Sequence, residues 1–149
     1  MSPAVNGKTK IVFMLIAICA AVGVGVSSVS LYHHYGTSKT SYCDIGENFN
    51  CDIVNRSIYS TVGGIPDALI GILGYLALLG LATFWRSRRE TPGMLLIASF
   101  GGLSFALYLT YIEKFVLATW CILCLSSLTM ITLITALSLY LATLSRRQA

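Results

Sequence analysis

The chain alternates between long uncharged stretches and short polar connections. Asp, Glu, Lys and Arg are absent from residues 11–38, 68–85, 91–112 and 115–145. A helix needs about 20 apolar residues to cross the hydrocarbon core of a bilayer. Trimmed of polar ends, the pattern predicts membrane-spanning helices at residues 11–31, 68–85, 92–112 and 120–144. The expected fold class is an all-α integral membrane protein, a bundle of four transmembrane helices that forms a single domain over residues 1–149.

Composition agrees with this pattern. The 149 residues are 56% hydrophobic and only 11% charged, whereas a soluble domain carries about 25% charged residues. The mean hydropathy is +0.77. These values exclude an ordinary soluble domain, because the polar residues are too few to cover its surface.

The basic residues predict the orientation. Seven of the ten Lys and Arg residues fall on one side of the predicted helices. They are Lys8, Lys10, Arg86, Arg88, Arg89, Arg146 and Arg147. Since cytoplasmic loops carry an excess of Lys and Arg, we expect both termini in the cytoplasm and residues 32–67 outside. The basic clusters are therefore topology signals, and no nucleic-acid partner is expected.

A cleaved signal peptide is the competing interpretation of the first apolar stretch. Lys8 and Lys10 precede it, and Gly25, Ser27 and Ser28 are small enough for a cleavage site. The apolar run continues to Leu31, which is longer than a usual signal h-region, and this favours a retained helix. Cleavage would leave the sidedness of the later cysteines unchanged.

Four of the five cysteines form two pairs at the same predicted membrane boundary. Cys43 and Cys51 lie in the outward segment, and Cys121 and Cys124 open the last helix. Residues three apart share a helix face, and a helix N-terminus favours the reactive thiolate. We expect Cys121 nearer the water and Cys124 about one turn deeper. The grouping predicts thiol–disulfide exchange from an outside protein to a lipid-soluble two-electron acceptor such as a quinone.

Other uses of these thiols stay open at this point. Four thiols could bind zinc, although seven residues separate Cys43 from Cys51, which is wide for a zinc motif. A structural disulfide would account for Cys43 and Cys51 alone. Cys19, inside the first helix, is interpreted as a small buried apolar residue.

Several other polar or amphipathic positions carry expectations. Residues 52–60 could form a short amphipathic helix on the membrane surface; its apolar side would be Ile53, Val54, Ile58 and Tyr59. Five glycines of the later helices are expected to permit close packing; these are Gly71, Gly74, Gly80, Gly101 and Gly102. His33 and His34 mark the exit of the first helix. Glu113 and Lys114 read as a solvated turn, with Lys114 able to stabilise a nearby thiolate.

Taken together, the motifs resemble those of bacterial members of the vitamin K epoxide reductase (VKOR) family. The matching motifs are Cys43-Asp-Ile, Phe49-Asn-Cys51, Gly64-Ile-Pro66 and Cys121-Ile-Leu-Cys124, with Val54, Ser57, Tyr59-Ser60 and residues 69–75 between them. The resemblance implies that Cys43 receives electrons, that Cys51 passes them to Cys121, and that Cys124 reduces a quinone, either ubiquinone or menaquinone. It also implies that Ser57 forms a hydrogen bond near this site.

Two more residues are candidates for the quinone site. Asp67 matches loosely a polar position of relatives near the quinone head group, and it could simply mark a helix N-terminus. Tyr75 faces the bundle if the second helix packs as expected, and would then line the pocket. Leu128 occupies the position of a tyrosine in animal relatives.

The resemblance also implies a location and a partner. We expect the protein in the bacterial inner membrane, with its cysteine pairs on the periplasmic side. Many bacterial relatives carry a fused thioredoxin-like domain after the membrane part, and we expect none here. The expected partner is therefore a separate periplasmic thioredoxin-like (DsbA-like) protein. The alternatives are a quinone-epoxide reductase, a DsbB-type bundle, or a non-catalytic metal-binding membrane module.

Overall fold

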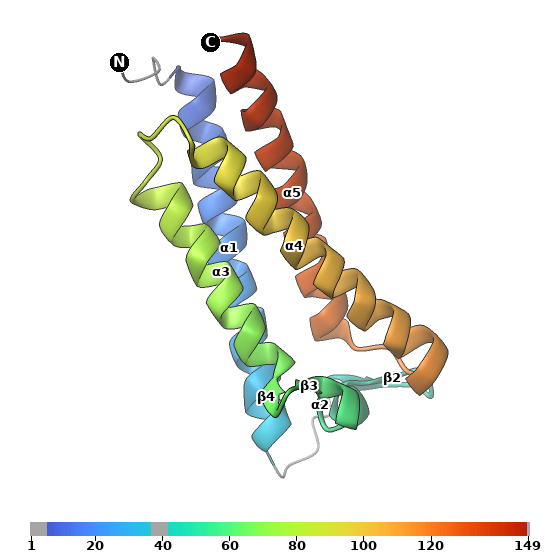
Figure 1. The fold of residues 1–149 in the computed structure, drawn as a ribbon. Coiled ribbons are helices and arrows are strands. Elements are labelled where there is room, and N and C mark those ends of the chain that lie inside the picture. Colours follow the sequence, from blue (N-terminus) through green and yellow to red (C-terminus); the bar gives the residue numbers. More distant parts are fainter. Residues whose placement is uncertain (1–5, 37–41, 149) are drawn as a thin grey trace.

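The computed structural model describes residues 6–36 and 42–148, and its long elements are four helices. These are α1 (Gly7–Tyr35), α3 (Asp67–Thr83), α4 (Thr91–Ile112) and α5 (Ile122–Arg147). Figure 1 shows that they form one bundle, with the start of α1 and the end of α5 at one end and the short strands at the other. Contacts between α1 and α3, α4 and α5, and α1 and α5 hold the bundle together.

The bundle is that of a membrane protein. Within the described residues, three helical stretches are long and apolar enough to cross a bilayer, namely Gly7–Tyr35, Thr91–Leu117 and Ile122–Arg147. The fourth helix, α3, is also apolar but has only 17 residues. The helices extend beyond the predicted 11–31 and 120–144 at some ends, because main-chain hydrogen bonding continues past the apolar residues, for example through His33 and His34.

Short elements fill the connection between α1 and α3. They are the strands β1 (Asp44–Ile45) and β2 (Phe49–Asn50), the helix α2 (Cys51–Asn55), the 3₁₀ turn η1 (Ile58–Ser60), and the strands β3 (Thr61–Val62) and β4 (Ile65–Pro66). Each strand pair is antiparallel. The turns use glycines with positive φ, which only glycine adopts without cost. Two small hairpins and two helical turns therefore close one end of the bundle.

The expected amphipathic helix over residues 52–60 is not a single helix. It breaks after α2, because Ser57 takes up an extended backbone conformation (φ −70°, ψ 159°) before η1 begins. Val54, predicted to face the membrane, is instead buried with the cysteines. Ile53 and Ile58 remain exposed.

The expected solvated turn at Glu113 and Lys114 is also wrong. The helix α4 continues into a π-helical turn, η2 (Glu113–Leu117), which ends where Ala118 adopts a left-handed conformation. Glu113 is only 1% exposed, because its carboxyl group accepts a hydrogen bond from the start of α5. Lys114 is exposed, and its ammonium group lies over the Phe115 ring.

A tyrosine joins three helices at the centre of the bundle. Tyr75 of α3 lies against Gly23 of α1, and its hydroxyl group makes 2.8 Å hydrogen bonds with the carbonyl and side-chain oxygens of Ser127 on α5. A Cβ atom at Gly23 would lie 2.4 Å from the Tyr75 ring. The absence of a side chain at Gly23 is thus what allows the ring to cross the bundle.

The five glycines predicted to pack helices divide into two groups. A Cβ at Gly71 would meet Ser27, and one at Gly102 would meet Ile131. Gly74, Gly80 and Gly101 have nothing within 4 Å of that position. The packing prediction therefore holds for two of the five positions, and the others face open space.

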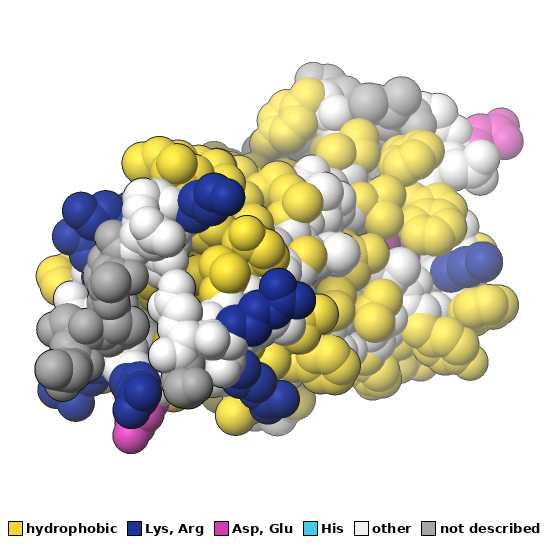
Figure 2. Space-filling model, turned by 90° about the horizontal axis from the view of Figure 1, so that it is seen from above, with side chains coloured by type: hydrophobic (Ala, Val, Ile, Leu, Met, Phe, Trp, Pro, Cys, Tyr) yellow, Lys and Arg dark blue, Asp and Glu magenta, His cyan; other side chains and the backbone are white. Residues whose placement is uncertain are grey.

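The basic residues gather at the end of the bundle that holds the termini. Figure 2 looks onto this end and shows Lys and Arg side chains around it, with little acidic surface. The described members are exposed, and they are Lys8, Lys10, Arg86, Arg88, Arg89, Arg146 and Arg147. The charge asymmetry seen in the sequence is therefore an asymmetry between the two ends of the molecule.

The contact between Gly23 and Tyr75 predicts a difference between two glycines on α1. We expect Gly23→Ala to lower the free energy of unfolding by about 1–3 kcal/mol, because the new methyl group overpacks the ring. Gly25→Ala is the matched control, since nothing lies within 4 Å of its Cβ position. Thermal unfolding of the purified protein in detergent measures both variants, and equal melting temperatures would contradict the packing role.

Candidate functional site

A hairpin register brings the first two cysteines together. Asp44 pairs with Asn50 and Ile45 with Phe49 across β1 and β2, so the next opposed positions are Cys43 and Cys51. They form a disulfide, with their Cα atoms 5.7 Å apart. The connection between the strands requires a positive φ of 72° at Gly46, which a glycine accommodates.

Two main-chain hydrogen bonds then attach this hairpin to the start of α5. The Asn50 N–H donates to the Trp120 carbonyl at 3.1 Å, and the Trp120 N–H donates to the Asn48 carbonyl at 2.8 Å. Phe49 and Trp120 thus form a parallel bridge. The residues that follow on each side, Cys51 and Cys121, are brought into contact, and the Cys121 thiol donates to the Cys51 sulfur at 3.3 Å.

The cysteine contact is sealed from water. Cys51 is 1% exposed and Cys121 is not exposed at all, and Val54 packs beside them. The hairpin and α2 therefore cover Cys121, and the expectation that it lies nearer the water than Cys124 stays a prediction. Cys121 also precedes the helix, as the extended residue that caps α5, so α5 starts later than the predicted residue 120.

The surroundings of Cys121 favour its thiolate. A hydrogen bond from the Cys124 thiol lowers the pKa of the Cys121 thiol below its ordinary value. Burial and the Glu113 carboxyl group act in the opposite direction but are outweighed. A thiolate is the attacking species in disulfide exchange, so the lowered pKa favours attack by Cys121 on the Cys51 sulfur beside it.

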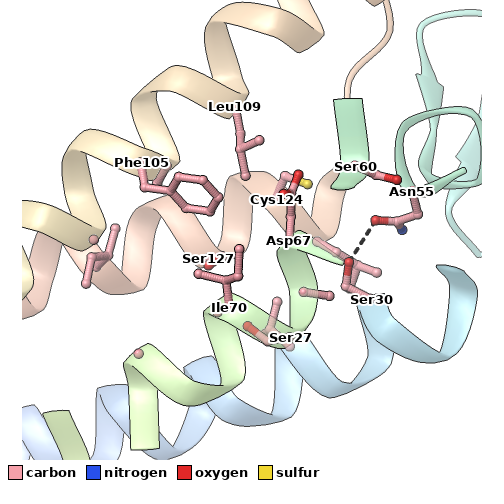
Figure 3. Close-up of a pocket in the computed structure, with 18 of the residues that line it drawn as sticks. Ser27, Ser30, Asn55, Ser60, Asp67, Ile70, Phe105, Leu109, Cys124 and Ser127 are labelled. Carbon is pink, nitrogen blue, oxygen red and sulfur yellow. Dashed lines mark hydrogen bonds between the residues drawn. The ribbon is translucent and has the colours of Figure 1, made fainter. Parts of the chain in front are cut away.

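A cavity of about 470 Å³ opens on the other side of the cysteine contact. Figure 3 shows side chains from α1, α3, α4, α5 and the connecting segment pointing into it, among them Cys124. The other sequence candidates Ser57, Asp67 and Tyr75 also line it. The structure therefore brings all the candidate quinone-binding residues to one cavity, and their roles stay predictions.

The cavity wall is mostly apolar but carries polar atoms without partners. Among the described residues, four buried polar side-chain atoms have no hydrogen-bond partner. Three of the four line this cavity, and they are Asn55 Nδ2, Asp67 Oδ1 and Glu113 Oε1. Buried polar atoms are normally satisfied, so unpartnered atoms around an open space indicate a site for a polar-ended ligand.

Sequence reasoning missed a polar network at the rim of this cavity. Ser30 of α1 donates to Asn55 Oδ1 at 2.8 Å, and His34 hydrogen-bonds to the Asn55 carbonyl group. Figure 3 shows the first of these bonds at the edge of the cavity. No local sequence signal marks Asn55 or Ser30, because their partners are more than 20 positions away. His33 has a different partner, the Tyr42 hydroxyl group at 2.6 Å.

Cys19 and Lys114 lie away from the cysteine contact, and the described residues form no metal site. Cys19 is a free cysteine packed against the apolar core, which agrees with its interpretation as an apolar residue. Lys114 is exposed and lies over Phe115. Among the described residues, no group of three or more His, Cys, Asp or Glu is arranged to hold a metal ion. The Cys43–Cys51 disulfide also occupies two of the four thiols that a zinc site would need.

The fold and the site together define a class of protein: a helical membrane protein with a disulfide and two free thiols gathered beside a mostly apolar cavity. A model of the vitamin K epoxide reductase family matches residues 14–139, which is most of the chain. The chain belongs to this family.

The hydrogen bond between the two cysteines of α5 predicts a pH effect on exchange. In a Cys19→Ala background, Cys124→Ala leaves Cys121 without its donor, so the pKa of Cys121 rises and less thiolate is present at neutral pH. Cys124→Ser keeps a hydroxyl donor and serves as the control. In both variants Cys121 can attack the Cys43–Cys51 disulfide and release the Cys43 thiol.

The rate of this release, followed by acid quenching and maleimide labelling of denatured protein, should rise with pH in both variants. We expect the midpoint of the profile at higher pH for Cys124→Ala than for Cys124→Ser. Coincident profiles would mean that Cys124 does not control the ionisation of Cys121.

Proposed function

We propose that this protein oxidises a dithiol protein outside the cytoplasm and passes the two electrons to a membrane quinone, thereby driving disulfide formation. The observation that carries the proposal is the 3.3 Å contact between Cys51 and Cys121 sulfurs. It joins the disulfide of the hairpin to the thiol pair beside the cavity. The family to which the chain belongs is one of oxidoreductases.

The electron path follows from the order of the sulfur atoms. A thiolate of the partner attacks Cys43, which breaks the Cys43–Cys51 bond and frees Cys51. Cys51 then attacks Cys121 of an oxidised Cys121–Cys124 pair, which frees Cys124. The second thiolate of the partner then attacks the partner–Cys43 disulfide, so that the partner leaves oxidised and Cys43 is freed. Cys43 attacks the Cys51–Cys121 disulfide, which re-forms the hairpin disulfide and frees Cys121. The structure has this disulfide closed and Cys121 and Cys124 as thiols, which is the state ready to deliver electrons.

The cavity supports a quinone as the acceptor. Its volume of about 470 Å³ lies within the range of small-molecule sites. The glycines Gly74 and Gly101 leave room at its wall, and Cys124 lines it. A quinone oxygen accepts hydrogen bonds, and the unpartnered Asn55 Nδ2 can donate one. The Asp67 carboxyl group can donate another when it is protonated. The bound quinone would accept both electrons and both protons of the thiol pair.

Ser57 and Tyr75 fit this site as supporting residues. The Ser57 hydroxyl group donates to the Val54 carbonyl at 2.9 Å, so its oxygen keeps free acceptor capacity toward the cavity. The Tyr75 hydroxyl group is occupied by Ser127, and its ring forms part of the wall. We therefore assign Tyr75 a packing role at the quinone site.

The orientation in the membrane follows from the charged end. We propose that both termini are cytoplasmic and that the hairpin and cysteines face the periplasm of a bacterial inner membrane, where disulfides persist. We also assign α3 as the fourth spanning helix. Its 17 residues measure about 26 Å at 1.5 Å per residue. This is slightly short of a hydrocarbon core of about 30 Å, a mismatch that local thinning accommodates.

The partner is expected to be a separate thioredoxin-like (DsbA-like) protein. Cys51 is the hairpin cysteine whose sulfur contacts Cys121, so Cys43 is the one left for an outside thiolate. Its burial at 2% exposure means that the partner must displace part of the hairpin surface to reach it.

The first test is quinone reduction by the purified protein with a reduced DsbA-like protein as donor. We expect turnover by the wild type with ubiquinone or menaquinone analogues, and loss of turnover in Cys43→Ala and Cys124→Ala. Cys124→Ala should still exchange with the donor. Its Cys121 can also attack Cys51 of the hairpin disulfide and release the Cys43 thiol, and the resulting Cys51–Cys121 disulfide should accumulate because Cys124 is not there to resolve it.

Full quinone turnover by Cys124→Ala would contradict the electron order. Absence of turnover by the wild type with either quinone, combined with reduction of a quinone epoxide by dithiols, would move the assignment to epoxide reductase chemistry. Cys19→Ala serves as the control and should turn over like the wild type, because Cys19 lies outside the relay.

The cavity itself can be tested with two glycines on α3. Gly74 lines the cavity whereas Gly80 does not, and neither has an atom within 4 Å of its Cβ position. We expect Gly74→Leu to cost about 1–3 kcal/mol of quinone binding, or roughly 5–150-fold in affinity. Gly80→Leu should bind normally. Exchange between the partner and the hairpin, measured without quinone, should be unchanged in both variants.

A further inference from the structure

Glu113 is a carboxylic acid in a place where a carboxylate is costly. It opens η2, is 1% exposed, and lines the cavity together with Cys124. One oxygen, Oε2, accepts a hydrogen bond from the Cys121 N–H at 3.1 Å. The other, Oε1, has no hydrogen-bond partner among the described residues. A buried charge without full compensation is unfavourable, so the position calls for an explanation.

Capping of α5 accounts for only half of this arrangement. The Cys121 N–H is one of the unpaired donors at a helix start, and any acceptor oxygen would satisfy it. A neutral amide would do so at less cost than an acid. Capping therefore explains the hydrogen bond to Oε2. It does not explain why the residue is an acid, or why Oε1 is buried without a partner.

The neighbours of Glu113 point to proton transfer. Its side chain interacts with both thiols of the α5 pair, Cys121 and Cys124. Other ionisable groups face it less directly. His34 from α1 and Asp67 from α3 line the same cavity, Cys51 from α2 is held in a disulfide, and Lys114 points outward. Glu113 is thus a buried acid that is held at the start of α5 and lines the cavity together with the Cys124 thiol.

We infer that Glu113 is the catalytic base that takes the proton from the Cys124 thiol and hands it to an oxygen of the acceptor in the cavity. The inference rests on the proposed function and names a residue for its last step. Two S–H bonds break and one Cys121–Cys124 bond forms, while two electrons and two protons pass to the quinone, giving the hydroquinone. Glu113 carries the proton of Cys124 to one quinone oxygen and then the proton of Cys121 to the other, and so ends as the carboxylate.

A purely electrostatic role makes the opposite prediction, which allows a sharp test. If Glu113 acted only as a nearby negative charge, it would disfavour the Cys124 thiolate, and its removal would speed reactions of that thiol. If Glu113 is the base, its removal slows them. Glu113→Gln keeps an oxygen for the Cys121 N–H and changes little else, so the sign of the effect separates the two roles.

The readout that needs no quinone is alkylation of Cys124 by iodoacetamide as a function of pH. The protein is full-length and carries Cys19→Ala, Cys43→Ala and Cys51→Ala, and modification at Cys124 is measured by mass spectrometry. We expect Glu113→Gln to slow alkylation near pH 7 by about tenfold, while Glu113→Asp recovers part of the rate. Lys114→Gln, on the adjacent exposed position, is the control and should alkylate like its parent.

In the otherwise unmodified protein, Glu113→Gln should reduce quinone turnover by about 10²–10⁴-fold, as is typical for loss of a general base. Exchange of the donor with Cys43 should be unaffected. Formation of the Cys51–Cys121 disulfide in a Cys43→Ala, Cys124→Ala background, treated with diamide, should also be unaffected, which checks that the site is folded.

Unchanged or faster alkylation in Glu113→Gln, in protein that passes this folding check, would overturn the inference and leave Glu113 as a cap of α5. Because alkylation is measured without quinone, this result is independent of whether the wild type reduces quinone at all. Failure of the proposed function would instead appear as absence of wild-type turnover.

Discussion

The parallel contact between the β1–β2 hairpin and Trp120 is the constraint on which the contact between Cys51 and Cys121 depends. Two main-chain hydrogen bonds set its register, and this register brings the Cys51 and Cys121 sulfurs to 3.3 Å. Cys51 and Cys121 are 70 positions apart in the chain. Without a main-chain register, two long-range side chains would have to find each other at a large cost in conformational entropy. The same hairpin also aligns Cys43 with Cys51, so one small element positions three of the four sulfurs.

The cavity beside the cysteine contact is lined in a way that does not favour stability. Its wall is mostly apolar, yet Asn55, Asp67 and Glu113 leave polar atoms unsatisfied. Each such atom costs roughly 1–3 kcal/mol when buried without a partner. Departures of this kind from the rules of stable packing are expected at functional sites. Glycines on α3 and α4 add to the effect, because they leave space where a side chain would otherwise fill the bundle.

The bundle tolerates this cavity because its centre is held by contacts suited to lipid. In a bilayer no hydrophobic force drives helices together, and close packing and hydrogen bonds take its place. Tyr75 provides both, since its ring lies on Gly23 and its hydroxyl group binds Ser127. The contact links α1, α3 and α5 at the wall of the cavity. Tyr75 therefore both forms part of the wall of the proposed quinone site and holds three helices together.

The sequence by itself determined the helices, the asymmetry of charge and the grouping of the cysteines. These follow from local properties: an uncharged stretch must become a helix in lipid, and Cys121 and Cys124 are neighbours by spacing alone. The tertiary structure decided what depends on distant partners. It buried Glu113 against the start of α5, covered Cys121 with the hairpin, turned Val54 inward and divided the expected helix at Ser57. None of these carries a local signal, because the hydrogen bonds and packing that select them come from elements far away in the chain.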